Sequence, residues 1–307
     1  MAEQFCTVND DVTLCYETFG DSADPAMLLV MGLSTQMIGW PDEFCEQLAA
    51  RGYFVVRFDN RDVGRSSQLK DFGVPTIKQL LLRDKRAARY TLEHMAADGI
   101  GLLDHLGIER AHVVGVSMGG MIAQTIAVRY PDRVLSLASI ISNTGARWSG
   151  QPSPRMYPLL LKRPPRDREG YVRHTVDVFT KIGSQGFPID REELRRTAER
   201  SFDRGLNPAG STRQLAAIIA SGDRTPLLRT ITAPTVVIHG HKDRLVPTSG
   251  GRATAKAIPG ARLVIIEGMG HDLPRGAWPQ LLDAIEHNAA RAGDPVGGEG
   301  VAGWRRP

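Results

Sequence analysis

Residues 111–126 read AHVVGVSMGGMIAQTI, in which Ser117 stands among glycines between two apolar runs. The run before the serine is typical of a buried strand, and the run after it of a buried helix. A sharp turn from strand to helix strains the backbone of its middle residue, and the flanking residues must lack bulky side chains. Gly115, Gly119 and Gly120 meet this demand. The stretch therefore predicts an elbow that lifts the Ser117 hydroxyl above the carboxyl edge of a sheet, where open α/β sheets bind ligands.

Strands and helices alternate on both sides of this elbow. Apolar or β-rich runs predict strands at residues 4–10, 12–20, 26–32, 53–58, 110–117, 133–142, 233–240 and 261–268. Helical spacing of apolar residues occurs at 41–52, 91–109, 118–131, 250–257 and from 278 onward. The first two strands are separated only by a polar turn and predict a hairpin. Because parallel neighbours need helical crossovers, the pattern predicts an α/β fold, a mostly parallel sheet with helices on both faces.

The alternation stops at about residue 143 and resumes at about residue 230. Between these points the sequence predicts three amphipathic helices, at 166–182, 190–204 and 210–221, and no strand. An all-helical block between two strands of one sheet is typical of a cap rather than of an independent domain. We therefore expect a core of residues 1–143 and 230–291, a helical cap of residues 144–229, and a flexible tail, rich in glycine and proline, of residues 292–307.

A serine hydroxyl needs a base to accept its proton, and that base needs an acid to orient it. Asp243 follows the strand predicted at 233–240 and His271 follows the next strand, so both lie at the same sheet edge as Ser117. The sequence thus predicts Ser117 as nucleophile, His271 as base and Asp243 as acid. His241, in the same loop as Asp243, remains a rival base. A small serine in a crowded turn, without a chemical role, is the plain alternative.

Two backbone N–H groups are expected to hold the oxyanion that forms when the serine attacks a carbonyl. One belongs to Met118, at the helix start, and the other to Leu33, in the turn after the strand at 26–32. A strand-end glycine without such a role is the alternative at Gly32. Asn143 stands at the other common position for the acid, but an amide carries no negative charge. We expect substrate-binding contacts from Gly32, Trp40 and Asn143.

Composition argues against several classes of function. The 307 residues carry a net charge of +4 with bases and acids interleaved, so no nucleic-acid partner is predicted. The three cysteines have no metal-type spacing, and no phosphate-binding or dinucleotide fingerprint occurs, so we expect neither metal nor cofactor. The start of the chain lacks a signal-peptide pattern, and its longest apolar run is far shorter than the ~20 residues that span a bilayer. These features predict a cytoplasmic protein.

The chain resembles the α/β-hydrolase superfamily. The stretches VMGL (30–33), FDNRDVGRSS (58–67), GVSMGG (115–120), HGHKDRLVP (239–247) and GMGHDLP (268–274) occur in the order of the family. Residues 28–44, 53–67 and 112–124 look most like actinobacterial carboxylesterases of the LipG type and the related methylesterases that act on anthracycline side esters. The resemblance implies cofactor-free hydrolysis by Ser117, His271 and Asp243. Many relatives have His-Gly at the oxyanion turn, where this chain has Met31-Gly32.

The sequence predicts a serine hydrolase that cleaves a carboxylic ester of a small molecule or lipid, and leaves the substrate and the oligomeric state open. Residues 145–230 carry 16 Lys and Arg against 9 Asp and Glu, and this excess of +7 either steers anionic substrates or only solvates helix faces. MYPLLL (156–161) is either an apolar lip that admits acyl chains or touches a lipid surface, or the core of the cap. IKQLLL (77–82), a short helix, either lines or closes the pocket. A thioesterase or phospholipase, and a ligand sensor without turnover, are the alternative functions.

Overall fold

An eight-stranded sheet forms the centre of the structure, a computed structural model that describes residues 2–9, 12–152, 156 and 164–293. The strands are β1 (Gln4–Thr7), β2 (Thr13–Phe19), β3 (Ala26–Val30), β4 (Phe54–Phe58), β5 (Ala111–Val116), β6 (Val134–Ile140), β7 (Thr235–Gly240) and β8 (Arg262–Ile266). Their order across the sheet is β1-β2-β4-β3-β5-β6-β7-β8. The predicted hairpin of β1 and β2 is confirmed, β2 and β4 are antiparallel, and the other neighbours are parallel.

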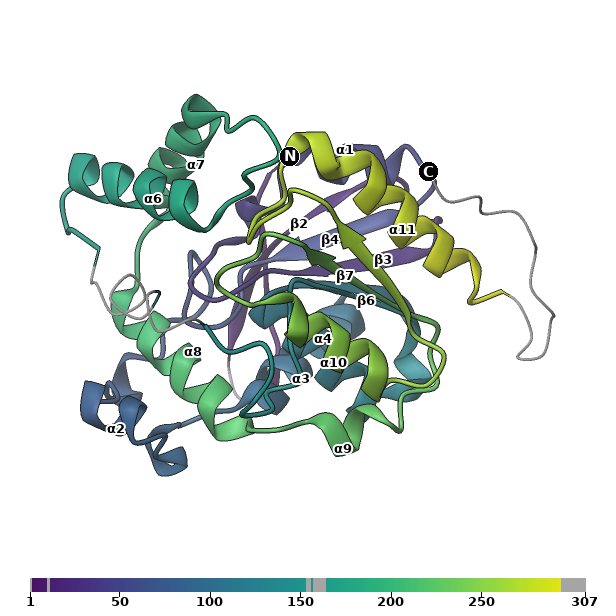
Figure 1. The fold of residues 1–307 in the computed structure, drawn as a ribbon, viewed down its shortest axis with the longest axis horizontal. Helices are drawn as coiled ribbons and strands as arrows, with labels where there is room; N and C mark the ends of the chain where they lie inside the picture. The colour runs from purple at the N-terminus through teal and green to yellow at the C-terminus, as the bar shows by residue number, and fades with distance from the viewer. Residues whose placement is uncertain (1, 10–11, 153–155, 157–163, 294–307) are drawn as a thin grey trace.

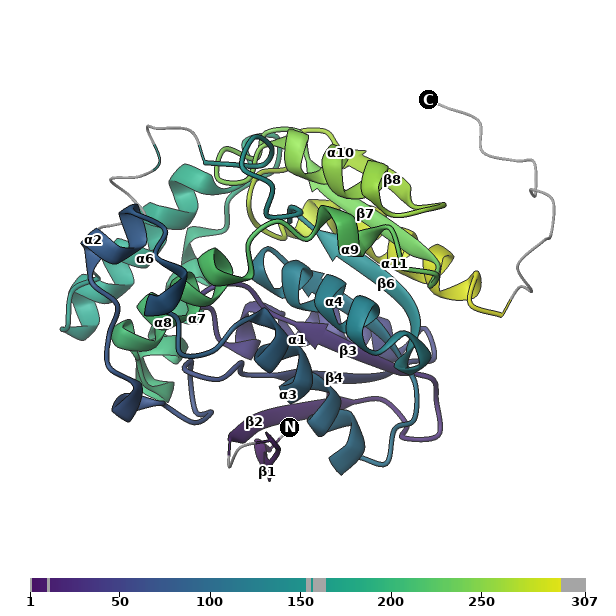
Figure 2. The ribbon, with the colours of Figure 1, turned by 90° about the horizontal axis from the view of Figure 1, so that it is seen from below.

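Helices cover both faces of the sheet because its strands are apolar on both sides. In β3, Met27 and Leu29 face one layer, and Leu28 and Val30 face the other. The first layer contains α1 (Asp42–Ala49) and α11 (Trp278–Ala290), and the second contains α3 (Leu92–His105), α4 (Met118–Arg129) and α10 (Thr248–Ala257) (Figures 1 and 2). The predicted fold class, a mostly parallel sheet between two layers of helices, is confirmed.

Four helices of the described residues stand between β6 and β7 in the chain, and we call them the helical insert. They are α6 (Arg168–Ile182), α7 (Arg191–Arg204), α8 (Pro208–Ser221) and α9 (Thr225–Leu228). The three helices predicted in this region are confirmed, and each ends at the predicted residue. The short α9 was not predicted. The limits of a cap at residues 144–229 stay a prediction.

The connection between β4 and α3 carries η3 (Lys70–Phe72), α2 (Ile77–Leu81) and η4 (Lys85–Ala87), so the short helix predicted at 77–82 is confirmed. The remaining short helices within the described ranges are η2 (Met37–Gly39), η5 (Pro131–Arg133) and η7 (Arg275–Ala277). Residues 157–161 of the predicted apolar lip and residues 294–307 of the predicted tail lie outside the described residues, whereas Met156 is buried. In the described part of the chain, no helix is both long and apolar enough to cross a bilayer.

Two buried ion pairs join the helical insert to the loop that follows β4. Arg213 of α8 donates two parallel hydrogen bonds to Asp62, with N–O distances of 2.6 and 2.7 Å. These hydrogen bonds raise the pKa of Arg213. Arg204 of α7 forms a second ion pair with Asp59, and all four side chains are buried. Because a buried carboxylate is costly without its partner, these pairs hold the insert against the sheet.

The substitution Arg213→Ala is expected to lower the free energy of unfolding by about 3–5 kcal/mol, because the buried Asp62 carboxylate then loses its cationic partner. Urea unfolding followed by circular dichroism measures the change. Arg173→Ala is the matched control, since Arg173 pairs with Glu169 in the same insert but both side chains are exposed. The control should leave the stability nearly unchanged, and an equal loss in both variants would contradict the anchoring role of Arg213.

Candidate active site

Ser117 lies at a strained turn between β5 and α4. Its backbone has φ 56° and ψ −117°, a conformation that non-glycine residues rarely adopt. The turn is closed so tightly that a Cβ atom on Gly119 would lie 2.0 Å from the carbonyl oxygen of Val30. A Cβ on Gly115 would lie 2.1 Å from the carbonyl oxygen of Gly119. The predicted strand–turn–helix elbow is therefore present, and both glycines are required by contact distances.

His271 lies between Ser117 and Asp243. Its Nε2 is 3.0 Å from the Ser117 hydroxyl oxygen, and its Nδ1 is 2.7 Å from Asp243 Oδ2. Because a carboxylate only accepts hydrogen bonds, Nδ1 carries the proton and Nε2 is left to accept one from the serine. The other oxygen of Asp243 accepts hydrogen bonds from the N–H groups of Leu245 and Val246. The structure thus brings the three predicted side chains into one chain of hydrogen bonds.

The rival histidines are held elsewhere. His241 is half-exposed and hydrogen-bonds to Glu267 rather than to the serine. His239 is buried, and its Nε2 donates to the carbonyl oxygen of Val246 at 2.7 Å. Burial lowers the pKa of His239, which keeps its ring neutral. Only His271, of the described histidines, contacts Ser117.

The predicted oxyanion side is formed by two chain segments that pass close to the serine. A Cβ atom on Gly32 would lie 3.2 Å from the Cβ of Ser117, so the turn after β3 runs directly beside the elbow. Met118 is the first residue of α4, and its N–H has no acceptor within the helix. These positions agree with the donor roles predicted for the Leu33 and Met118 N–H groups, which stay a prediction.

Two of the predicted substrate contacts have other roles. Trp40 has no exposed surface and stacks on Phe44 with ring centroids 5.5 Å apart, so its predicted place in a substrate-binding wall is wrong. Asn143 is buried, and its side chain donates to Gly150 and accepts from the N–H of Gly145. Asn143 therefore shapes the loop that leaves β6. The sequence indicates that both residues lie near the edge of the sheet. The direction of each side chain, however, depends on how it packs against its neighbours.

The helical insert also holds the loop of His271, which sequence reasoning missed. The N–H of His271 donates to the carbonyl oxygen of Ile182 at 2.8 Å, at the end of α6. Ser184 accepts from the N–H of Gly270 at 2.9 Å and donates to Asp272 at 2.5 Å. A Cβ on Gly270 would lie 2.4 Å from the backbone of Gly183, so the two segments touch. No local pattern announces a contact between segments more than eighty residues apart in the chain.

A second polar residue of the insert supports the oxyanion side. Gln214 of α8 accepts from the N–H of Ser34 at 2.9 Å and donates to the carbonyl oxygen of Arg61 at 2.8 Å. Its side chain is buried, so it links the turn after β3 to the loop after β4. Within the described residues, no group of three or more His, Cys, Asp or Glu side chains is arranged to hold a metal ion. The arrangement places a histidine nitrogen where it can accept the proton of the Ser117 hydroxyl.

Comparisons with known proteins agree with the fold. A family model described as the alpha/beta hydrolase fold matches residues 25–274. Rhodomycin D methylesterase DnrP of Streptomyces peucetius is 33% identical over 303 residues, which cover 90% of this chain and 95% of that protein. The 3-oxoadipate enol-lactonase 2 of Acinetobacter baylyi is 26% identical over 257 residues, which cover 84% of this chain and 86% of that protein. The solved enol-lactonase from Burkholderia xenovorans LB400 has a TM-score of 0.71 at 23% identity, covering 94% of this chain and 100% of that one. The likeness to methylesterases that the sequence indicated is confirmed.

The substitution Ser184→Ala is expected to lower kcat for p-nitrophenyl acetate by about tenfold with little change in KM, because a displaced His271 loop misaligns the proton acceptor. Steady-state kinetics measure both constants. Thr180→Ala is the matched control, since the Thr180 hydroxyl bonds only within α6, to the carbonyl oxygen of Val176. If both variants lose the same activity, Ser184 has no special part in positioning His271.

Proposed function

Because the chain belongs to the alpha/beta hydrolase fold family, we propose that it hydrolyses carboxylic esters through an acyl-enzyme on Ser117. The observation that carries the proposal is the position of His271, whose ring contacts Ser117 through one nitrogen and Asp243 through the other. A serine hydroxyl is a weak nucleophile unless a neighbouring base removes its proton. The proposed function follows from that contact and from the orientation that Asp243 gives to the ring.

The acylation step begins when the Ser117 oxygen attacks the ester carbonyl carbon and its proton moves to Nε2 of His271. Asp243 stabilises the imidazolium that forms and keeps the proton on Nδ1. The backbone N–H groups of Met118 and Leu33 are the proposed donors to the tetrahedral oxyanion. The imidazolium then protonates the leaving alcohol, and the carbon–oxygen bond of the ester breaks.

The deacylation step repeats the same transfers with water. His271 accepts a proton from the water as the water attacks the acyl carbon, and returns that proton to the Ser117 oxygen when the acid leaves. Ser117 is only half-buried, so a water molecule can reach the acyl group on it. Asp243 and His271 are buried, and this burial keeps their side chains aligned. Besides the ester and the water, both steps use only groups of this chain.

We take the substrate to be a small-molecule carboxylic ester. Rhodomycin D methylesterase, the relative with 33% identity, supports this class. Residues 145–230 carry a net charge of +7. This positive charge supports a substrate that has an anionic group in addition to the ester. A thioesterase or phospholipase uses the same acylation chemistry. These alternatives therefore differ from an esterase in their substrate and not in their catalytic residues. A ligand sensor would bind without turnover.

The substitution Ser117→Ala is expected to reduce kcat/KM by about 10⁴-fold or more, and Asp243→Asn to reduce kcat by about 10⁴-fold because an amide favours the wrong tautomer of His271. The assay compares methyl esters, p-nitrophenyl esters of rising chain length and acyl-CoA thioesters. Ser22→Ala, at an exposed turn, is the matched control and should be as active as the unaltered protein.

Labelling with a fluorophosphonate separates the enzyme from a sensor. The unaltered protein should gain one adduct on Ser117, found by mass spectrometry of its peptides, and Ser117→Ala should gain none. Ester hydrolysis that survives in Ser117→Ala would overturn the proposed mechanism. If the protein turned over acyl-CoA faster than every oxygen ester, its function would be that of a thioesterase rather than an esterase.

A further inference from the structure

A group of exposed apolar side chains surrounds α2. Nine large apolar side chains are exposed among the described residues, and five of them lie in one short stretch: Phe72, Val74, Ile77, Leu81 and Leu82, which we call the α2 patch. Leu81 and Leu82 expose 63% and 71% of their surface. Single exposed apolar residues are common on any protein, but a gathered group marks an interaction surface.

Local structure holds the α2 patch outward. Thr76 and Gln79 form a capping box that fixes the start of α2. Ile77 and Leu81 follow one turn apart, so they share one side of the helix. Both α2 and η4 pack against α8 of the insert, and the patch lies on the outside of this contact. The expectation that residues 77–82 line or close the pocket stays a prediction.

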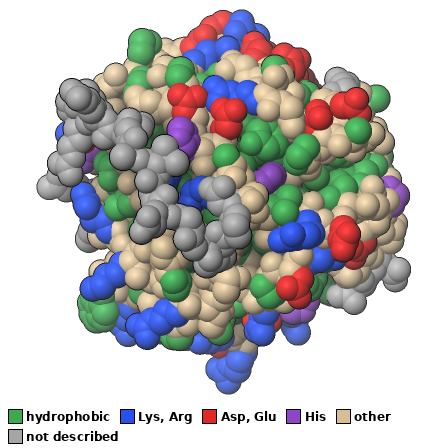
Figure 3. Space-filling model, turned by 90° about the vertical axis from the view of Figure 1, so that its right-hand side faces the viewer, with side chains coloured by type: hydrophobic (Ala, Val, Ile, Leu, Met, Phe, Trp, Pro, Cys, Tyr) green, Lys and Arg blue, Asp and Glu red, His purple; other side chains and the backbone are tan. Residues whose placement is uncertain are grey.

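Cations surround the α2 patch. Residues 70–89 carry six positive side chains, Lys70, Lys78, Arg83, Lys85, Arg86 and Arg89, against Asp71 and Asp84, a net charge of +4. Asp84 pairs with Arg86, and the other five cations form no ion pair with any described residue. On the face that Figure 3 shows, by contrast, several acidic and basic side chains lie next to one another. The α2 patch is thus an apolar centre with an uncompensated positive border.

A pocket of about 570 Å³ opens beside this segment. Arg83 and Lys85 line it together with Arg147 and Trp148 from the loop that leaves β6. Trp148 is 91% exposed, and the guanidinium of Arg147 lies 5.5 Å from the centre of its ring. Asp223 is the one carboxylate among the described residues that line the pocket. Three cations beside an exposed indole suit an anionic headgroup at the border of an apolar phase, where tryptophan is enriched.

We propose that the α2 patch docks the protein on an anionic lipid surface. The five apolar side chains enter the boundary between headgroups and acyl chains, and the surrounding Lys and Arg side chains contact the headgroups. Arg83, Lys85 and Arg147 bind a headgroup phosphate in the pocket, with Trp148 at the level of the interface. This docking goes beyond the proposed ester hydrolysis and does not depend on it.

The combination of features favours a lipid surface over a protein or nucleic-acid partner. A nucleic acid pairs with the cations but leaves the apolar side chains in water. A second copy of this chain would bring the same unpaired cations together, which costs free energy. An anionic bilayer satisfies both the apolar centre and the positive border at once.

Co-sedimentation with vesicles tests the proposal. The protein should bind phosphatidylcholine vesicles that contain phosphatidylglycerol much more tightly than vesicles of phosphatidylcholine alone, and added salt should weaken the binding. Leu81→Ser/Leu82→Ser should weaken it by about tenfold or more, because both side chains lose their place in the apolar phase. Arg83→Glu/Lys85→Glu should weaken it by at least about 25-fold, since each cation near such a surface contributes about fivefold.

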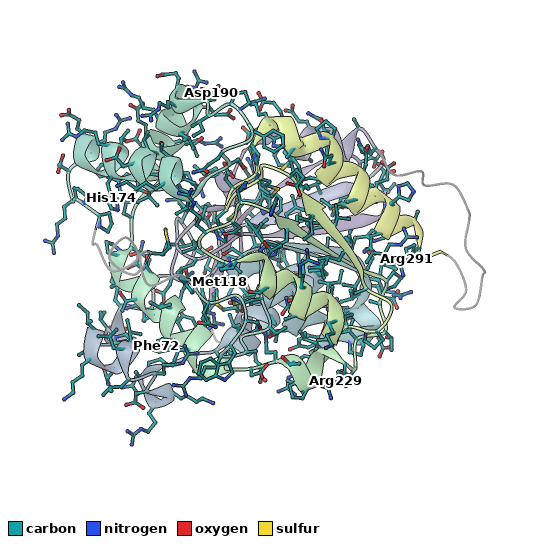
Figure 4. All side chains as sticks on the ribbon, viewed as in Figure 1. Phe72, Met118, His174, Asp190, Arg229 and Arg291 are labelled. Carbon is teal, nitrogen blue, oxygen red and sulfur yellow. The ribbon has the colours of Figure 1, made fainter. Side chains whose placement is uncertain are left out.

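Matched controls come from the far end of the insert. Figure 4 labels Phe72 and Asp190 at well-separated corners of the molecule. Ile189 is an exposed apolar residue next to Asp190, and Arg191 and Arg196 are exposed cations of α7. Ile189→Ser and Arg191→Glu/Arg196→Glu should bind vesicles as the unaltered protein does. All four variants should keep its melting temperature and its rate with p-nitrophenyl acetate, which shows that folding and catalysis are intact.

Results of two kinds, from vesicle binding and from gel filtration, would overturn the proposal. The first is equal binding of the unaltered protein to neutral and anionic vesicles, or equal binding of the α2-patch variants and the controls. The second is a dimer in gel filtration that Leu81→Ser/Leu82→Ser dissociates, since the patch would then be the contact between two copies. A loss of esterase activity in Ser117→Ala with unchanged vesicle binding supports docking as a separate property.

Discussion

The strained backbone of Ser117 is the constraint on which the rest of the structure depends. Its positive φ persists because three segments close around it: the end of β3 at Val30, the elbow glycines, and the carbonyl oxygen of Ile140, which accepts from the Ser117 N–H at 2.9 Å. A larger residue at Gly119 would push the helix away from β3 and relax the turn. The geometry that exposes the hydroxyl is therefore supported by the packing of the whole sheet centre.

The helical insert contributes to the site as well as covering it. Its α6 end carries the carbonyl oxygen that binds the N–H of His271, and its α8 carries Gln214, which binds the turn beside Gly32. The buried pairs of Arg204 with Asp59 and Arg213 with Asp62 fix these helices against the loop after β4. Because the same insert touches both sides of the elbow, a shift of the insert would move the proton acceptor and the proposed oxyanion donors together.

Charges are distributed very differently in the interior and at α2. Inside, each of the two insert arginines described above meets a carboxylate, as the cost of burying an unpaired charge requires. Around α2, five cations meet none among the described residues, and exposed apolar side chains lie between them. The cost of burying an unpaired charge thus explains the first set, and the proposed docking on an anionic lipid surface accounts for the second.

The sequence by itself determined the order of strands and helices, the elbow at Ser117, and the choice of Asp243 and His271, because these depend on local patterns and on which sheet edge each strand reaches. The hairpin and the insert helices were accordingly predicted correctly, and His271 lies within hydrogen-bonding distance of both Ser117 and Asp243 as predicted, while the catalytic roles of these residues stay a proposal. The complete burial of Trp40 and the exposure of Ile77, Leu81 and Leu82 were not predicted, since side-chain direction depends on neighbours far away in the chain. The contacts of Ser184 and Gln214 with the site, and the pairing of Arg213 with Asp62, exist only in the tertiary structure. They join segments about 90 to 180 residues apart, and no local spacing encodes which of many polar side chains will meet.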